Sequence, residues 1–268
     1  GRQDLVKRGF IEAEGKLFST AFSAFVQDAY QREVGEEPVE VQAERLRSVE
    51  VELEKAREMQ MGLLPQQEPV AAGMDIASRC VPASHVGGDF FNYIWFDDEQ
   101  TKLAIVSVDV MGHGMEGAVT AMRCSETLRY ESRGRSGAAE ILAGLNRALH
   151  GTLRRGEFVA CCIGVIDVVR RTMDVGVGGH PPPLQYSHAD DRVIDPDLGN
   201  LPLGLKSDID YTSVQLNFVD GDILLFYSDG VIEAQDDREV LYGDDRLQDL
   251  LLQAGRRGLD AKGLIELL

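Results

Sequence analysis

Residues 103–118 read LAIVSVDVMGHGMEGA, and this stretch decides the fold that we expect for the chain. The apolar run 103–110 has the length and β-branched content of a buried strand, and a glycine-rich turn follows it directly. Asp109 stands where the strand becomes the turn. The same pattern recurs in HVGGDFFNY around Asp89 and in LLFYSDGVIEA around Asp229. Because hydrophobic residues precede each acid, we expect the three carboxylates to emerge at one rim of a sheet core.

Other segments of the chain extend this pattern in both directions. Short apolar or β-branched runs predict strands at 74–81, 158–169, 173–177, 183–187, 213–219 and 222–228. Helical patterns interrupt them at 116–132 and 137–150, and a third helix is predicted from about residue 244 to 268. Strands that sit together, with helices inserted in blocks, favour an α+β fold with largely antiparallel sheets.

The N-terminal part differs in composition from the rest, and this difference divides the chain into three predicted segments. Residues 1–38 are interpreted as the helical tail of a regulatory region, 39–66 as a coiled-coil linker helix that Pro65 ends, and 67–268 as the main domain. The linker pattern is equally typical of an amphipathic helix on its own domain and of a dimerising, signal-carrying helix. Its predicted seam has 3-4 spacing, with Gln60 as the one polar intrusion, and consists of Leu46, Val49, Leu53, Ala56 and Leu63.

Composition narrows the classes of partner and compartment. The 268 residues include 45 acidic and 27 basic ones, a net charge of −18, which makes nucleic acid and anionic membranes poor partners. No apolar run approaches the roughly 18 residues of a membrane span, so we expect a cytoplasmic protein. The adjacent Cys161 and Cys162 should point to opposite faces of a strand as buried thiols.

The three acids indicate a site for a hard metal ion. Clustered carboxylates, backbone carbonyls and water suit Mg²⁺ or Mn²⁺, and no set of His and Cys has the spacing of a zinc site. A single Asp-Gly pair usually marks only a turn. Three acids, each following hydrophobic residues in a glycine-containing context, favour the metal site instead.

Six ordered motifs carry a resemblance to a known family. They are AREMQMGLLP (56–65), VPASHVGGDFF (81–91), VDVMGHGMEGA (108–118), GGHPPPL (178–184), LPLGL (201–205) and YSDGVIEA (227–234). From about residue 56 onward, the chain resembles the SpoIIE/RsbU-like branch of the PPM phosphatases, which are metal-dependent protein serine/threonine phosphatases of bacteria. The resemblance implies an αββα sandwich, with two antiparallel sheets flanked by helices and a two-metal site at one edge.

The resemblance also assigns roles to residues. Three acids match catalytic metal ligands of the family, namely Asp89, Asp109 and Asp229, and Asp109 matches the acid that bridges two ions. Val110 matches the residue whose backbone carbonyl completes the coordination shell of one ion. Two Mn²⁺ or Mg²⁺ ions about 3.5–4 Å apart would activate a bridging water and neutralise the phosphoryl oxygens. His113 is a candidate proton donor to the leaving serine, with a turn role as the alternative.

Four further side chains receive weaker assignments. His180 is expected to pin its proline-rich loop against the sheet rather than to react. His85 stands where relatives often have a basic residue, which makes a phosphate contact there doubtful. Arg79 and Arg123 are candidate substitutes for that contact.

The resemblance finally implies a function and its partners. It implies hydrolysis of phosphoserine or phosphothreonine on a phosphorylated anti-anti-sigma (STAS) protein, within a partner-switching pathway that controls a sigma factor. An upstream sensor domain or protein and a homodimer through 39–64 are expected with it. Family members usually end in an Asp-Asp-x-Thr strand with a further metal-site Asp, which AKGLIELL (261–268) does not include. The alternative is therefore a catalytically impaired docking module with the phosphatase fold.

Overall fold

The computed structural model describes residues 39–62, 64–82, 87–112, 114–154 and 156–268. The predicted regulatory tail, 1–38, lies outside this part. The chain divides into two units, Gly1–Leu53 and Glu54–Leu268, and the boundary falls inside helix α3 (Val39–Met61). The seam side chains predicted along this helix also lie outside the described residues, so the homodimer seam stays a prediction. In the described part, no helix is both long enough and apolar enough to cross a membrane.

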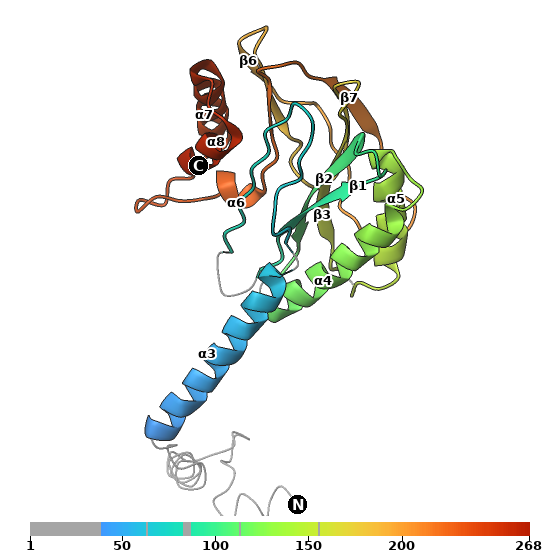
Figure 1. The fold of residues 1–268 in the computed structure, drawn as a ribbon. Coiled ribbons are helices and arrows are strands. Elements are labelled where there is room, and N and C mark those ends of the chain that lie inside the picture. The colour runs from blue at the N-terminus through green and yellow to red at the C-terminus, as the bar shows by residue number, and fades with distance from the viewer. Residues whose placement is uncertain (1–38, 63, 83–86, 113, 155) are drawn as a thin grey trace, which may run out of the picture. The chain divides into compact units, whose positions relative to one another are not determined.

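Two antiparallel sheets form the centre of the second unit (Figure 1). The larger sheet has the order β1-β2-β3-β4-β7, and the smaller has the order β6-β5-β8. The strands of the larger sheet are β1 (Phe90–Trp95), β2 (Lys102–Val110), β3 (Val159–Asp167), β4 (Thr172–Gly178) and β7 (Ser213–Asn217). Those of the smaller sheet are β5 (Leu184–Ser187), β6 (Arg192–Ile194) and β8 (Ile223–Leu225).

Helices cover both outer faces of this pair of sheets. Helices α4 (Gly114–Glu131) and α5 (Ala138–His150) pack on the larger sheet, and α7 (Asp244–Arg257) and α8 (Ala261–Leu267) pack on the smaller one. A single-turn helix, α6 (Asp229–Ile232), follows β8. The layers are therefore α, β, β and α, which confirms the expected sandwich.

Alternation along β3 shows how the layers are built. Cys161 belongs to the core between the larger sheet and its helices, whereas Cys162 belongs to the core between the two sheets. Both are fully buried and free. Successive residues of a strand point to opposite faces, so a strand buried on both sides is apolar throughout. The predicted placement of the two thiols is confirmed.

Several predicted boundaries were wrong. Residues 74–81 form no strand, although Met74 packs against the inter-sheet core, because the segment pairs with no neighbouring strand. Strands β1 and β6 and helix α6 were not predicted. The C-terminal helix is two helices, because Gly258 adopts a left-handed conformation (φ 62°) and ends α7. Helix α3 ends at Met61, ahead of Pro65.

Candidate metal centre

Strand register brings two of the predicted acids together. Strands β1 and β2 pair antiparallel, with Phe90 opposite Val108. Continuing this register by one residue places Asp89 opposite Asp109, and the two side chains interact through a hydrogen bond. Like charges directly across two strands are destabilising. The pair is therefore unfavourable to folding when both carboxyl groups are ionised, which indicates a role other than stability.

The third acid reaches the same place from the other sheet. Asp229 begins helix α6, which follows β8, and its charge acts on both Asp89 and Asp109. The neighbouring Ser228 side chain forms a hydrogen bond with Asp89. The structure thus places Asp89 beside Asp109, and Asp229 lies near enough for its charge to act on both.

Gly88 exposes a backbone oxygen beside these acids. A Cβ on Gly88 would collide with the carbonyl oxygen of Val110, so the two backbones touch only because residue 88 is glycine. On the far side, Val159 lies opposite Val110 but exchanges its backbone hydrogen bonds with Leu203, at 3.0 and 2.8 Å. The Val110 carbonyl is therefore not used by β3. It faces the Asp89 side, where it can act as a metal ligand.

The electrostatics of the acids favour a cation. Burial first, and then the Asp89 and Asp229 carboxylates, raise the pKa of Asp109 to about 7. Burial likewise raises the pKa of Asp89, against the lowering effect of its hydrogen bonds with Asp109 and Ser228. A hydrogen bond between two carboxyl groups requires a proton on one of them. A divalent cation would replace that proton and neutralise the cluster.

The donor set fits a hard cation without forming a complete shell. Carboxylate and carbonyl oxygens are the donors that Mg²⁺ and Mn²⁺ prefer. Among the residues that the structure describes, however, no group of three His, Cys, Asp or Glu side chains is placed to hold an ion. The arrangement is two adjacent acids, the Val110 carbonyl beside them, and Asp229 acting through its charge.

His180 supports strand β2 from the loop after β4. Its Nδ1 lies 2.9 Å from the carbonyl oxygen of Pro181, which can only accept, so Nδ1 carries the proton. Its Nε2 then accepts from the Ser107 hydroxyl at 3.0 Å. Burial lowers the pKa of His180, which favours this neutral form. The ring pins the loop to the strand, as predicted, two residues before Asp109.

The remaining predicted side chains are two histidines and two arginines. His113 and His85 lie outside the described residues, so their roles stay predictions. Arg123, on α4, donates to the backbone carbonyl of Thr152 at 3.1 Å, and Arg79 is exposed. Within the described part, no hydrogen bond or ion pair connects either arginine to the three acids.

Sequence reasoning missed the role of Gln60. Its side-chain amide pairs with both backbone groups of Gly87: Nε2 donates to the carbonyl oxygen, and Oε1 accepts from the amide at 3.0 Å. Gln60 is buried at 5% exposure, in the last turn of α3. The helix is thereby attached to the glycine pair that precedes Asp89. The signal in the sequence is the polar residue that interrupts the apolar pattern of the helix.

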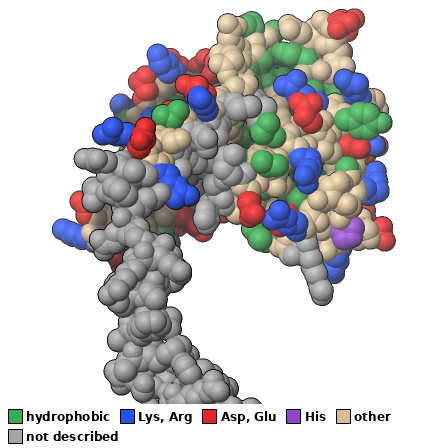
Figure 2. Space-filling view, turned by 90° about the horizontal axis from the view of Figure 1, so that it is seen from below, with side chains coloured by type: hydrophobic (Ala, Val, Ile, Leu, Met, Phe, Trp, Pro, Cys, Tyr) green, Lys and Arg blue, Asp and Glu red, His purple; other side chains and the backbone are tan. Residues whose placement is uncertain are grey.

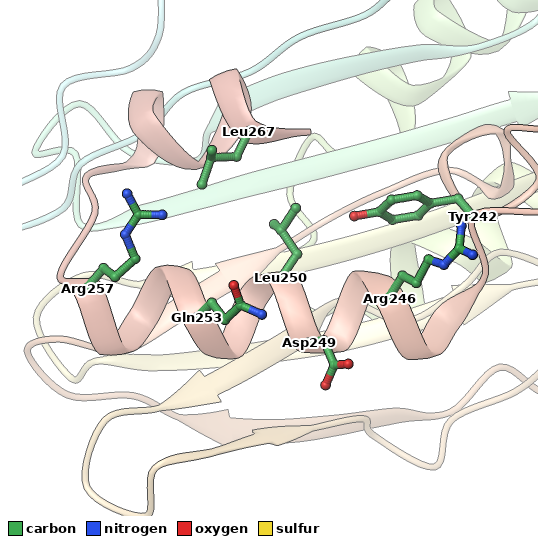
Figure 3. A pocket seen from close by; sticks show the side chains of 7 residues that line it. All are labelled: Tyr242, Arg246, Asp249, Leu250, Gln253, Arg257 and Leu267. Carbon is green, nitrogen blue, oxygen red and sulfur yellow. The ribbon is translucent and has the colours of Figure 1, made fainter. Parts of the chain in front are cut away.

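A cavity elsewhere in the domain contains none of these residues. It has a volume of about 390 Å³ and is formed by α7, Tyr242 and Leu267 (Figure 3). In Figure 3, Leu250 and Leu267 point toward each other across the hollow. Its lining includes neither a predicted metal ligand nor a proposed proton donor, so it is separate from the candidate metal centre.

Comparison with known proteins agrees with this architecture. The family model described as Stage II sporulation protein E (SpoIIE) matches residues 99–268. Phosphoserine phosphatase RsbU of Bacillus subtilis (strain 168) is 28% identical over 207 residues, which cover 76% of this chain. They cover 59% of the relative, so the chain spans less than two thirds of its length.

Two solved structures share the fold. The SiaA-PP2C domain of Pseudomonas aeruginosa has a TM-score of 0.67 at 21% identity, covering 83% of this chain and 87% of that one. The RsbU and RsbW domains of Rv1364c from Mycobacterium tuberculosis have a TM-score of 0.55 at 26% identity, and the match covers 65% of this chain and 48% of that one. Since the family model matches more than half of the chain, and a PP2C domain shares its sandwich, the chain belongs to the SpoIIE family.

Proposed function

We propose that the chain is a metal-dependent phosphatase that hydrolyses phosphoserine or phosphothreonine on a protein. One observation carries the proposal: Asp89 and Asp109 are held opposite each other across two strands, with the charge of Asp229 acting on both. This crowding destabilises the fold without a cation and suits a cation-dependent reaction. The similarity to an RsbU whose name describes a phosphoserine phosphatase supports the same reaction class.

The residues of the chain have distinct tasks in this proposal. Asp89, Asp109, Asp229 and the carbonyl of Val110 would hold Mn²⁺ or Mg²⁺, two ions by the family pattern. When bound, the ions supply an activated water and positive charge against the phosphoryl oxygens. Gly88 keeps the Val110 carbonyl accessible, and the Ser107–His180 contact fixes the strand that carries Asp109. His113 remains the candidate donor of a proton to the leaving hydroxyl.

The substrate class and partners belong to the same proposal. We infer that the phosphoprotein is a STAS-type anti-anti-sigma factor in a partner-switching pathway, with an upstream sensor and a homodimer through 39–64. Similarity to a protein with both RsbU and RsbW domains supports such a pathway. The alternative, a docking module with impaired catalysis, is favoured by one observation: the described residues include no group of three side chains placed to hold an ion.

Phosphate release measured across a Mn²⁺ titration tests the proposal. The substrate is a STAS protein phosphorylated on serine, and Mn²⁺ binding is measured in parallel by calorimetry. We expect metal-dependent release that Asp109→Asn abolishes and that Asp98→Asn, at an exposed position, leaves intact. Binding of the STAS protein without release at any Mn²⁺ concentration would identify the docking module instead.

A further inference from the structure

A second cavity, of about 440 Å³, lies at the outer edge of the larger sheet. Its walls come from the segment after α3, from edge strand β1 and from α4, and include Pro65, Pro69, Asn92, Tyr93, Trp95 and Arg129. The volume falls within the usual range of small-molecule pockets, roughly 300–1,000 Å³. Like the cavity on α7, it contains none of the three acids.

Asn92 gives this cavity an unsatisfied donor. The side chain is 4% exposed, and its Oδ1 accepts from the Tyr93 backbone amide at 2.8 Å. Its Nδ2 is buried and has no hydrogen-bond partner among the described residues. A buried amide without a partner loses its hydration and gains nothing in return, so native structures rarely keep one without a reason. A ligand acceptor would satisfy it if the Asn92 amide turned toward the cavity that this residue lines.

Arg129 gives the cavity a positive charge. It lies on the exposed surface of α4 and makes no ion pair with any residue that the structure describes. Exposed basic side chains of this kind stand among acidic ones on the face that Figure 2 shows, although the chain as a whole carries a net charge of −18. An uncompensated guanidinium beside an amide donor is complementary to a carboxylate.

The remaining walls suit an apolar group. Pro65, Pro69 and the Trp95 ring contribute apolar surface. Tyr93 lines the same wall and adds the surface of its ring. Ligand sites generally combine such apolar walls with a few convergent polar groups.

We propose that this cavity binds a small organic carboxylate, whose carboxylate contacts Arg129 and the Asn92 amide while its apolar body packs against Trp95. The ligand would contact the segment that follows α3 and the strand that follows Asp89. The proposal does not depend on the phosphatase activity, because binding is measured without substrate or metal.

Trp95 is the only tryptophan of the chain, so its fluorescence reports on this cavity directly. The purified chain is titrated with acetate, butyrate and phenylacetate, and with phenylacetamide as the neutral counterpart of phenylacetate. We expect a saturable change with phenylacetate, at a dissociation constant of about 1–10 mM for a ligand of this size. Phenylacetamide should bind at least ten-fold more weakly.

Three variants complete the test. Arg129→Gln, at an exposed position that does not threaten folding, should weaken phenylacetate binding about ten-fold, and Asn92→Asp should abolish it by repulsion. Arg133→Gln removes the same charge four residues further along the chain, in the turn after α4 and outside the cavity, and should change nothing. Equal binding of acid and amide, equal effects of the two arginine variants, or no saturable response to any of the three acids would overturn the proposal.

Discussion

Replacing Gln60 with Met tests whether α3 controls the glycine pair before Asp89. The substitution keeps the length of the side chain and removes both hydrogen bonds to Gly87. Each such bond contributes about 0.5–1.5 kcal/mol, and a buried group left without a partner costs about 1–3 kcal/mol. Because Gly87 is only partly buried, water can replace some of the loss. We therefore expect a decrease of about 1–2 kcal/mol in the free energy of unfolding.

The same substitution should weaken metal binding. Without Gln60, the backbone that leads into Asp89 is free to move, and binding a cation must restrict it again. A cost of about 1.4 kcal/mol corresponds to a ten-fold change in an equilibrium constant. We expect the Mn²⁺ dissociation constant from calorimetry to rise by up to ten-fold, and the midpoint of urea unfolding to fall at an unchanged m-value.

Gln67→Met is the matched control. Gln67 is an exposed glutamine close to Gln60 in the chain, and no hydrogen bond of its side chain is seen in the described part. It should leave both measurements unchanged. If Gln60→Met and Gln67→Met have the same unfolding free energy within about 0.3 kcal/mol and the same Mn²⁺ affinity, the attachment of α3 to Gly87 has no energetic role.

Three further predictions concern the acids, the inter-sheet core and the linker. Asp109 has a pKa of about 7, above the roughly 3.9 of an unfolded Asp, so the folded metal-free chain binds the extra proton between these values. The unfolding free energy of the metal-free chain should therefore fall between pH 5 and 8 relative to that of the Asp109→Asn variant. Thermal unfolding of both proteins in EDTA measures this, and pH profiles that run parallel would contradict it. Gly164→Ala places a Cβ 2.6 Å from the Phe226 ring and 2.8 Å from the Met173 sulfur, and should cost about 1–3 kcal/mol in urea unfolding. Leu53→Asp should change both the molar mass in light scattering and the phosphatase activity; if neither changes, the seam has no such role.

The sequence identified the acids because their signal is local, and missed what depends on pairing. Asp109 and Asp229 follow apolar runs, which is visible in one dimension, whereas Asp89 follows two glycines and precedes its strand, contrary to the predicted order. The segment 74–81 has the composition of a strand, but only the fold shows that no neighbour pairs with it. Conversely, β1 lies within the motif around Asp89, and the apolar FFNYIW carries no alternation that marks it as an edge strand.

The motifs that seemed merely characteristic of the family have structural tasks around the same strand end. Leu203, in LPLGL, forms hydrogen bonds with both the backbone amide and the backbone carbonyl of Val159. The Val110 carbonyl, opposite Val159, is therefore not part of the hydrogen-bond ladder with β3. His180, in GGHPPP, accepts the Ser107 hydroxyl in the same strand. Gln60 holds Gly87 on the opposite side. A pair of facing carboxylates would push the ends of β1 and β2 apart, and these contacts restrain both strands and the Val110 carbonyl. Metal affinity at this site should therefore depend on residues that never touch the ion, and Gln60 is the member of this set through which α3 can act.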